Sequence, residues 1–238
     1  MKNNIVITSF AWKMAERVLL QGLAVVVQVI LARLLMPSDF AAVALINAVI
    51  HYLGLFVQSG LSTVVVQKKE LDNKDISTLM TYSLCTATLL YISIFFLAPL
   101  LSNYYNVGDL ILPIRVAALS LFLYSFNSIQ TGILSRQMRF RTIFFLSIVA
   151  MPIAAVIAIT MAFCGMGIWA LICNTLLNIL LTVIIMNTMP ELRIKLGFSF
   201  IRFKQLFSFS GKILLTTLIS GGGDTLRTLV IGKFYSQN

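Results

Sequence analysis

Seven long apolar stretches, separated by short polar segments, constrain this chain more than any other feature. Each stretch is long enough to cross the ~30 Å hydrocarbon core of a membrane as a helix. Lipid offers the backbone no hydrogen-bond partner, whereas a helix satisfies its own backbone groups. We therefore predict an all-α, polytopic transmembrane helical bundle. The predicted spans, numbered in chain order, are Phe10–Leu34, Ala41–Val66, Thr78–Leu100, Leu110–Leu134, Ile143–Cys164, Met166–Met189 and Phe209–Ile231.

The composition supports a membrane protein. Hydrophobic residues make up 59% of the 238 residues and charged residues 11%, whereas about 25% of a soluble domain is charged. The formal net charge of +10 suggests nucleic acid at first sight, but the basic residues lie between the apolar stretches, where they act as topology signals and contact anionic lipids. We therefore expect membrane lipids, and no nucleic acid, as partners. The three cysteines lie in or at the end of spans without a CxxC motif, so we expect buried hydrophobic residues and no metal or cofactor.

The basic residues are distributed unevenly between the two ends of the spans. Most of the 18 lysine and arginine residues fall near the N-terminus or in the segments after spans 2, 4 and 6. Alternating spans place all of these on one side of the membrane. Because cytoplasmic loops are enriched in Lys and Arg, the bias places the N-terminus in the cytoplasm. Residues Phe198–Phe207 mix phenylalanines with Arg202 and Lys204, which favours an amphipathic helix along the cytoplasmic interface.

Polar residues recur on one face of several spans. At about 100° per residue, the polar positions of span 1 fall within about 80° of one another and those of span 2 within about 60°. Span 6 repeats polar residues at intervals of four, and spans 4 and 7 carry broader polar faces. Lipid cannot solvate such faces, so we expect them to line other helices or a water-filled cavity. The candidate substrate-binding residues of this cavity are Arg17, Gln21, Gln28, His51, Gln58, Arg115, Asn127, Asn174, Asn178, Asp224 and Arg227.

The same residue types also have structural roles. Amides and hydroxyls often join membrane helices by hydrogen bonds worth less than about 1–2 kcal/mol each. Lys13 lies close enough to the cytoplasmic face to snorkel, and His51 is either a packing residue or a proton-linked group. Among the charged candidates we favour Arg17, Arg115 and Arg227, because a guanidinium deep in a bundle is costly and its fork suits phosphate oxygens.

The start of span 7 resembles the start of span 1. Ser9–Lys13 (SFAWK) recurs as Ser208–Lys212 (SFSGK), and the polar positions of span 1 map onto polar positions of span 7. An even number of spans separates the two starts, so both copies have the same orientation, as in a parallel repeat. We therefore predict a first lobe of six spans at 1–190, a cytoplasmic or interfacial linker at 191–208, and the first span of a truncated second lobe at 209–238.

Several motifs resemble those of one family. The stretch ILARLLMPSDFAAVALINAVIHYLGLFVQSGLSTVVVQ is similar to the first two spans of bacterial polysaccharide flippases of the O-antigen and colanic-acid exporter type, within the multidrug/oligosaccharidyl-lipid/polysaccharide exporter superfamily. LSRQMRF after span 4 and GMGIWAL between spans 5 and 6 extend the resemblance. Ala41 stands where the family usually has Gly, so a small residue is kept. Family members are longer and have a second lobe, so the chain resembles their N-terminal half.

The resemblance implies a flippase, not an enzyme, in the bacterial cytoplasmic (inner) membrane. Such a protein would turn oligosaccharide repeat units linked to undecaprenyl pyrophosphate to the outer leaflet for surface polysaccharide biosynthesis, by alternating access between two lobes. The arginines would hold the pyrophosphate, and the amides and hydroxyls would hold the glycan. The implied partners are the lipid-linked oligosaccharide, a second lobe or copy, and other polysaccharide assembly proteins.

Three other functions stay open. A multidrug exporter of the same superfamily would use membrane-embedded acids for cation coupling, but within the spans only Glu16 and Asp224 are acidic, each beside basic residues that can neutralise it. A membrane enzyme is disfavoured because the sequence has no HExxH, GxSxG or Walker A motif and no large extramembrane loop. An inactive or accessory half-protein is compatible with every feature above.

Overall fold

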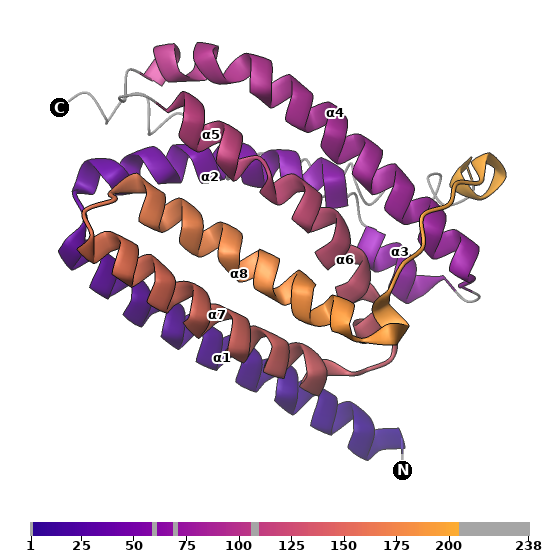
Figure 1. Ribbon diagram of the computed structural model, residues 1–238. Coiled ribbons are helices and arrows are strands. Elements are labelled where there is room, and N and C mark those ends of the chain that lie inside the picture. The colour runs from indigo at the N-terminus through magenta and orange to yellow at the C-terminus, as the bar shows by residue number, and fades with distance from the viewer. Residues whose placement is uncertain (1, 59–60, 69–70, 106–109, 205–238) are drawn as a thin grey trace.

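A computed structural model shows a bundle of helices (Figure 1). It describes residues 2–58, 61–68, 71–105 and 110–204, and within these ranges it describes side chains from residue 12 onward, except at residue 105. No strand occurs in these ranges. The helices are α1 (Lys2–Leu34), α2 (Pro37–Gln58), α3 (Leu61–Gln67), α4 (Asn73–Tyr105), α5 (Ile111–Ala117), α6 (Ser120–Arg136), α7 (Phe140–Phe163) and α8 (Ile168–Thr188), followed by the 3₁₀ turn η1 (Pro190–Leu192).

The structure confirms the predicted all-α multi-pass architecture in the part of the chain that it describes. Six helical segments there are long and apolar enough to cross a membrane, and they coincide with predicted spans 1 to 6. The third span is longer than predicted, because α4 extends beyond Thr78–Leu100 at both ends. Predicted span 7, with candidates Asp224 and Arg227, lies outside the described residues.

Predicted span 4 is not a single helix. It consists of α5 and α6, with a turn at Ala118–Leu119 between them. The Ser120 hydroxyl donates to the Ala117 carbonyl oxygen at 2.7 Å, and the Leu119 and Leu121 amides bond to carbonyl oxygens three residues earlier. Hydrogen bonds that span three residues, and not four, tighten the backbone here as in a 3₁₀ helix. The hydroxyl of Ser120 thereby offers the backbone an alternative to the regular α-helical ladder.

Helix α8 lies in the middle of the bundle (Figure 1). It packs on α7 on one side and on α2, α5 and α6 on the other, while α1 packs on the far side of α7 and α4 packs on α2, α5 and α6. Side chains on the different faces of α8 therefore lie beside several different helices. This position makes the polar residues of α8 the natural centre of an internal site.

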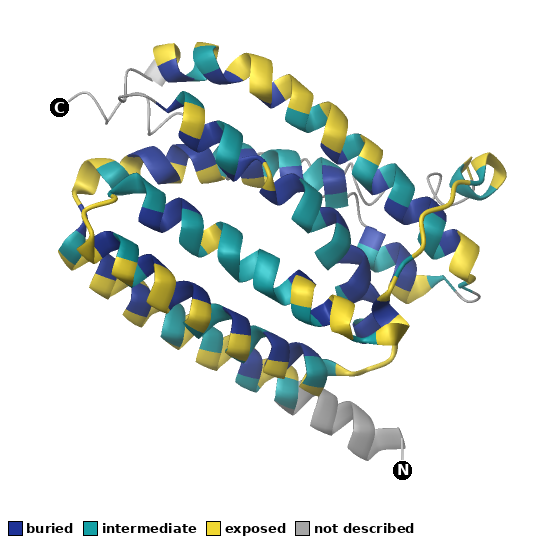
Figure 2. Cartoon of the chain, viewed as in Figure 1, coloured by how far each residue is buried: buried dark blue, intermediate teal, exposed yellow. Residues whose placement is uncertain are grey.

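Exposed residues lie along the outer faces of the helices (Figure 2), and many of them are large and apolar. On α4, for example, Leu89, Phe96 and Leu100 are 67%, 74% and 68% exposed. In water such residues would be a liability, but in a membrane they contact lipid tails. The polar residues with low exposure, such as Ser125, Ser128 and Gln130, lie inside instead. The polar groups are thus directed inward, which is the arrangement that a spanning bundle requires.

Two turns at one end of the bundle fix the starts of α2 and α8. The amide of Met36 donates to Asp39 Oδ2 at 3.3 Å, which caps the first turn of α2, and Pro37 is tolerated there because first-turn amides lack helical partners. Gly165 (φ +74°) and Gly167 (φ +51°) reverse the chain between α7 and α8. Only glycine adopts such angles without strain. The tight turn holds α7 and α8 antiparallel and in contact.

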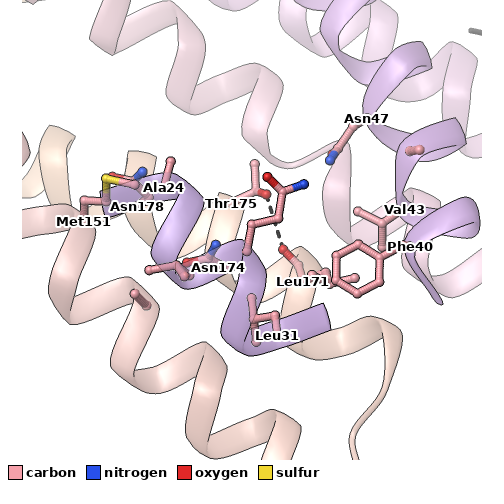
Figure 3. Close-up of a pocket in the computed structure, with 14 residues that line it drawn as sticks. Ala24, Leu31, Phe40, Val43, Asn47, Met151, Leu171, Asn174, Thr175 and Asn178 are labelled. Carbon is pink, nitrogen blue, oxygen red and sulfur yellow. Dashed lines mark hydrogen bonds between the residues drawn. The ribbon is translucent and has the colours of Figure 1, made fainter. Parts of the chain in front are cut away.

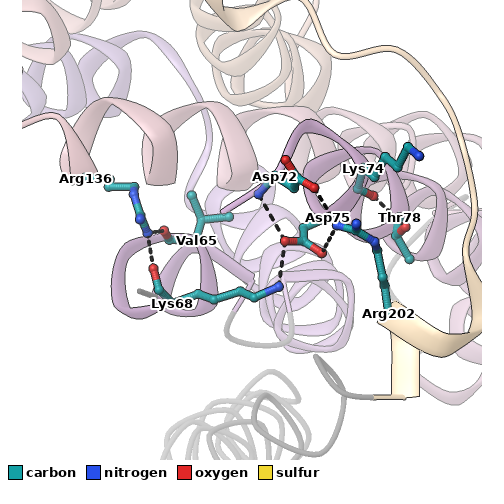
Figure 4. A network of polar contacts seen from close by, with 8 residues as sticks. All are labelled: Val65, Lys68, Asp72, Lys74, Asp75, Thr78, Arg136 and Arg202. Atoms are coloured by element: carbon teal, nitrogen blue, oxygen red, sulfur yellow. Dashed lines mark hydrogen bonds and ion pairs between the residues drawn. The ribbon is translucent and has the colours of Figure 1, made fainter. Parts of the chain in front are cut away.

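The segment after α8 is fixed to the opposite end of the bundle by a polar network (Figure 4). Arg202 donates to Asp75 Oδ1 at 3.0 Å and to Asp72 Oδ2 at 3.1 Å, and Lys68 pairs with Asp75 at 2.6 Å. The hydrogen bonds that Arg202 donates to Asp75, and then to Asp72, raise the pKa of Arg202 above its ordinary value, so this guanidinium stays charged. Arg136 donates to the carbonyl oxygens of Val65 and Lys68. The segment predicted as a linker is therefore docked on α4 by an ion-pair network in its described part.

Candidate functional site

Helix α8 carries a stripe of polar residues. Asn174, Asn178 and Thr182 follow one another at intervals of four, and Thr175 lies beside them. The Thr175 hydroxyl donates to the Leu171 carbonyl oxygen at 3.2 Å and the Thr182 hydroxyl to that of Asn178 at 2.8 Å. Both hydroxyls thus bond within α8. The side-chain amides of Asn174 and Asn178 have no hydrogen-bond partner among the described residues, so they are free to bind a ligand.

The first cavity beside this stripe lies between α1, α2, α7 and α8 and has a volume of about 320 Å³. Figure 3 shows Asn47 of α2 with Asn174 and Asn178 of α8 around it, and Gln28 of α1 also lines it. The remaining wall is largely apolar, with Phe40 at the α2 side. Amides among apolar side chains form a lining that binds hydroxyl groups through hydrogen bonds and the C–H faces of a sugar through packing.

A second cavity, of about 240 Å³, adjoins the first between α2, α5, α6 and α8. Asn47 lines both cavities, and His51 follows it one turn later on α2. Tyr124 and Ser120 line the α6 side. Helices α2 and α6 approach closely here, because a Cβ placed on Gly54 would lie 3.1 Å from the Tyr124 ring.

A third cavity, of about 440 Å³, lies between α1, α6, α7 and α8. Lys13 and Glu16 line it from α1, and they form an ion pair at 2.8 Å. The α6 side carries Asn127 and Thr131, whose hydroxyl donates to Asn127 Oδ1 at 3.4 Å. Ser147 adds a hydroxyl from α7.

The three cavities adjoin one another at α8. Thr175 lines all three, and Asn174 and Asn178 line the first and the third. We call these three cavities, which share lining residues around the α8 stripe, the polar pathway. No group of three or more His, Cys, Asp or Glu side chains that could hold a metal ion occurs in the described part of the chain.

Five of the predicted site residues are brought together by the structure. They come from α1, α2, α6 and α8, four helices that are distant in sequence, and all of them line the polar pathway. They are Gln28, His51, Asn127, Asn174 and Asn178.

Four other predicted site residues lie apart from the pathway. Arg17 and Gln21 are exposed on α1, and Gln58 is half-buried on the last turn of α2; none of the three lines the described cavities. Arg115 faces α4, where its guanidinium carbon lies 3.8 Å from the centroid of the Phe95 ring and its Nη2 donates to the Phe95 carbonyl oxygen at 3.3 Å. In this structure the two described arginines that we favoured as phosphate ligands therefore do not point into the pathway.

Sequence reasoning passed over several residues that line the pathway. Thr175 belongs to no i, i+4 series of polar residues, so its position on α8 gave no signal. Tyr124 lies four residues after Ser120 and four before Ser128, a spacing by four on α6 that the sequence analysis did not use. Lys13 was expected to snorkel and Glu16 to be neutralised by a local pair. The local pair is present, but it also faces the third cavity. The signal available was the spacing of Lys13 and Glu16, which places an acid and a base on one face of α1.

The helices and the internal pathway define a multi-pass membrane protein with polar groups gathered inside the bundle. The chain belongs to the polysaccharide biosynthesis protein family, whose model matches residues 30–238. It is also similar to the succinoglycan biosynthesis transport protein ExoT of Rhizobium meliloti (strain 1021), with 26% identity over 169 residues, which cover 71% of this chain and 34% of that protein. The chain thus matches about a third of the length of this relative. No solved structure matches. The resemblance to polysaccharide flippases is confirmed at the level of the family.

Proposed function

We propose that this chain forms one lobe of a polysaccharide exporter that moves lipid-linked oligosaccharide across the bacterial cytoplasmic membrane. The observation that carries the proposal is the polar pathway, which gathers amides from α1, α2, α6 and α8 within a membrane-spanning bundle. The family supports it, and so does the relative whose name describes a transport protein of polysaccharide biosynthesis. Transport, and not catalysis, is therefore the activity that we assign.

The lining of the pathway suits a glycan. Each side-chain amide offers two donors and an acceptor to sugar hydroxyls, and Asn47, Asn174 and Asn178 offer these without a partner among the described residues. Because large apolar side chains are exposed on the outer faces of the bundle, the polyprenyl tail of the substrate would stay in the bilayer beside them. The sugar then lies inside the protein while its lipid carrier stays outside.

The proposed orientation places the docked linker segment at the cytoplasmic end. Arg139 of the α6–α7 turn pairs with Glu191 of η1, so the basic residues of that turn and of the linker lie at one end of the bundle. Cytoplasmic ends of spans are enriched in such residues. Loading from the cytoplasm would therefore begin at the end that carries Lys13 and Thr182.

Replacing the pathway amides tests the function. In cells that express the chain in its natural context, Asn174→Leu combined with Asn178→Leu is expected to lower surface polysaccharide by about tenfold or more, because several hydrogen bonds to the glycan are lost. Lipid-linked intermediates should accumulate in the cytoplasmic leaflet, and the protein level in the membrane should stay normal. Immunoblotting and extraction of polyprenyl-linked sugars measure these quantities.

Gln137→Leu is the matched control, because Gln137 is an exposed amide in the α6–α7 turn. It should leave surface polysaccharide unchanged. If the double variant exports polysaccharide normally, the proposed function is wrong. If it instead lowers resistance to toxic compounds while polysaccharide is unchanged, the multidrug exporter becomes the better assignment.

A further inference from the structure

The polar pathway is chemically asymmetric. Its middle, around Asn47, Asn174 and Asn178, is lined by neutral amides and hydroxyls. The charged side chains among its described lining residues, Lys13 and Glu16, both lie in the third cavity. This is the end at which α1 begins and the linker segment docks (Figure 1). Among the described lining residues, the Lys or Arg side chain that an anionic group of a substrate would meet is therefore Lys13.

The two charges are held differently. The Glu16 side chain is 11% exposed, whereas that of Lys13 is 52% exposed, with Nζ 2.8 Å from Glu16 Oε2. A carboxylate buried in a membrane bundle is costly unless a cation accompanies it. Lys13, in contrast, carries a flexible stem and reaches the open part of the cavity. The pair is therefore neutral as a whole, but its cation can exchange partners.

The other basic side chains that the structure describes on α1 and α7 do not line this cavity. Arg17, one turn further along α1, is exposed outside it. Arg141 of α7 lies 5.6 Å over the rings of Trp12 and Phe145 at the outer surface. The lining of the cavity adds Tyr124 from α6 as a titratable group, and α8 contributes neutral side chains. A ligand anion in this cavity thus meets Lys13 first.

We propose that Lys13 is the binding subsite for a phosphoryl group of the substrate and that Glu16 is its displaceable counter-ion. The inference rests on the proposed function, because it supplies the phosphate position of a substrate whose glycan lies against the amides. When a phosphoryl oxygen takes the place of Glu16 beside the Lys13 ammonium, the carboxylate loses its partner while still buried. It then takes up one proton from water at that end of the pathway and returns it when the phosphoryl group leaves.

Proton uptake makes binding depend on pH in a defined direction. The bound state holds one more proton than the free state, so affinity rises as pH falls, by at most about tenfold per pH unit. Neutral polyprenyl ligands should show no such dependence. If the Lys13–Glu16 ion pair were purely structural, pyrophosphate binding would show neither proton uptake nor this dependence of affinity on pH.

The test uses the full-length protein in phosphatidylcholine nanodiscs, with polyprenyl pyrophosphate as the probe and the corresponding polyprenyl alcohol as the neutral comparison. Isothermal titration in buffers of different ionisation enthalpy counts the protons taken up. The unaltered protein should bind the pyrophosphate with uptake of up to one proton. Lys13→Met should weaken binding about 10- to 100-fold, as expected for a lost charge-assisted hydrogen bond, and Lys13→Arg should restore it.

Glu16→Gln separates the proposal from a structural role. It should bind the pyrophosphate as tightly as the unaltered protein or more tightly, and without proton uptake, because the competing carboxylate is gone. Arg33→Met is the matched control, since Arg33 is an exposed cation at the other end of α1, and its affinity should be unchanged. Equal affinities of Lys13→Met and the unaltered protein, or a loss caused by Arg17→Met instead, would overturn the proposal, as would undiminished proton uptake in Glu16→Gln.

Two further experiments identify the source of the phosphate and distinguish a failure of this inference from a failure of the proposed function. If phosphatidylglycerol nanodiscs or free inorganic pyrophosphate compete fully with the probe, Lys13 binds phosphate in general and the assignment to a lipid-linked substrate is wrong. If Asn174→Leu with Asn178→Leu abolishes export while Lys13→Met binds normally, the function stands and this inference fails. If Lys13→Met loses binding but Asn174→Leu with Asn178→Leu leaves export unchanged, this inference stands and the proposed function fails.

Discussion

At the scale of single residues, Gln130 shows how a buried amide can serve structure and not transport. It lies fully buried in α6, and its Nε2 donates to Asn187 Oδ1 at 2.7 Å and to the Leu192 carbonyl oxygen at 3.2 Å. These contacts join α6 to the end of α8 and to η1. Asn178, by contrast, lies in the pathway without such bonds among the described residues. The partners of an amide, and not its residue type, distinguish the two roles.

Gln130→Leu is therefore expected to destabilise the protein. The change leaves Asn187 Oδ1 and the Leu192 carbonyl without their donor, which costs about 1–3 kcal/mol. The midpoint of thermal unfolding in detergent should fall, whereas the exposed Gln137→Leu should change stability by less than about 0.5 kcal/mol. Similar midpoints for both variants would contradict the structural role.

At the scale of elements, the tight turn between α7 and α8 holds the α8 stripe in register with the rest of the pathway. Gly167 has φ +51° and ψ −126°, a conformation that is essentially restricted to glycine. A Cβ at this position would also contact the Asp39 carboxylate at 3.5 Å. The turn thus links the start of α8 to the start of α2, the two helices that supply Asn174 and Asn47.

Gly167→Ala is expected to lower stability by about 1–3 kcal/mol because of backbone strain. The matched control, Gly22→Ala, is expected to change stability in the opposite direction. Gly22 lies in the middle of α1, and no neighbouring atom lies within 4 Å of the point that an added Cβ would occupy, so Gly22→Ala should stabilise α1 by about 0.5–1 kcal/mol. Thermal unfolding of the two purified variants measures both shifts. A neutral Gly167→Ala would show that the turn adapts without strain.

The comparison of sequence and structure is clearest for residues on helical faces. Apolar length predicted the spans, and spacing by four correctly grouped Asn174 with Asn178 on one side of α8. Spacing alone cannot say which neighbour a face meets, and so it gave no warning that Arg115 packs on Phe95 of α4. That information comes from the packing of helices distant in sequence. The predicted counterpart in span 7 lies outside the described residues.

At the scale of the whole molecule, the chain after α8 is fixed to the bundle and does not simply leave it. Thr81 of α4 bonds both to the carbonyl oxygen and to the amide of Gly197, at 3.1 Å and 3.3 Å. The Phe203 ring packs on Tyr82 with centroids 5.0 Å apart. Together with the Arg202 network these contacts attach the described residues after α8 to α4 as far as Phe203.

Asp75 is the centre of this attachment, and its replacement gives a test at the same scale. Its side chain is 2% exposed and accepts hydrogen bonds from Lys68, Arg202 and the backbone amide of Asp72. Asp75→Asn leaves both cations without their shared carboxylate. Because Lys68 and Arg202 are each about a third exposed, solvent offsets part of the loss, and we expect the docked segment to be weakened by about 1–3 kcal/mol. Trypsin should then cleave at Lys195, Arg202 or Lys204 about tenfold faster or more, because cleavage follows the population of the undocked state. Asp72→Asn is the matched control. Its side chain is 68% exposed, so it should change cleavage little, and equal rates for the two variants would show that Asp75 does not hold the segment in place.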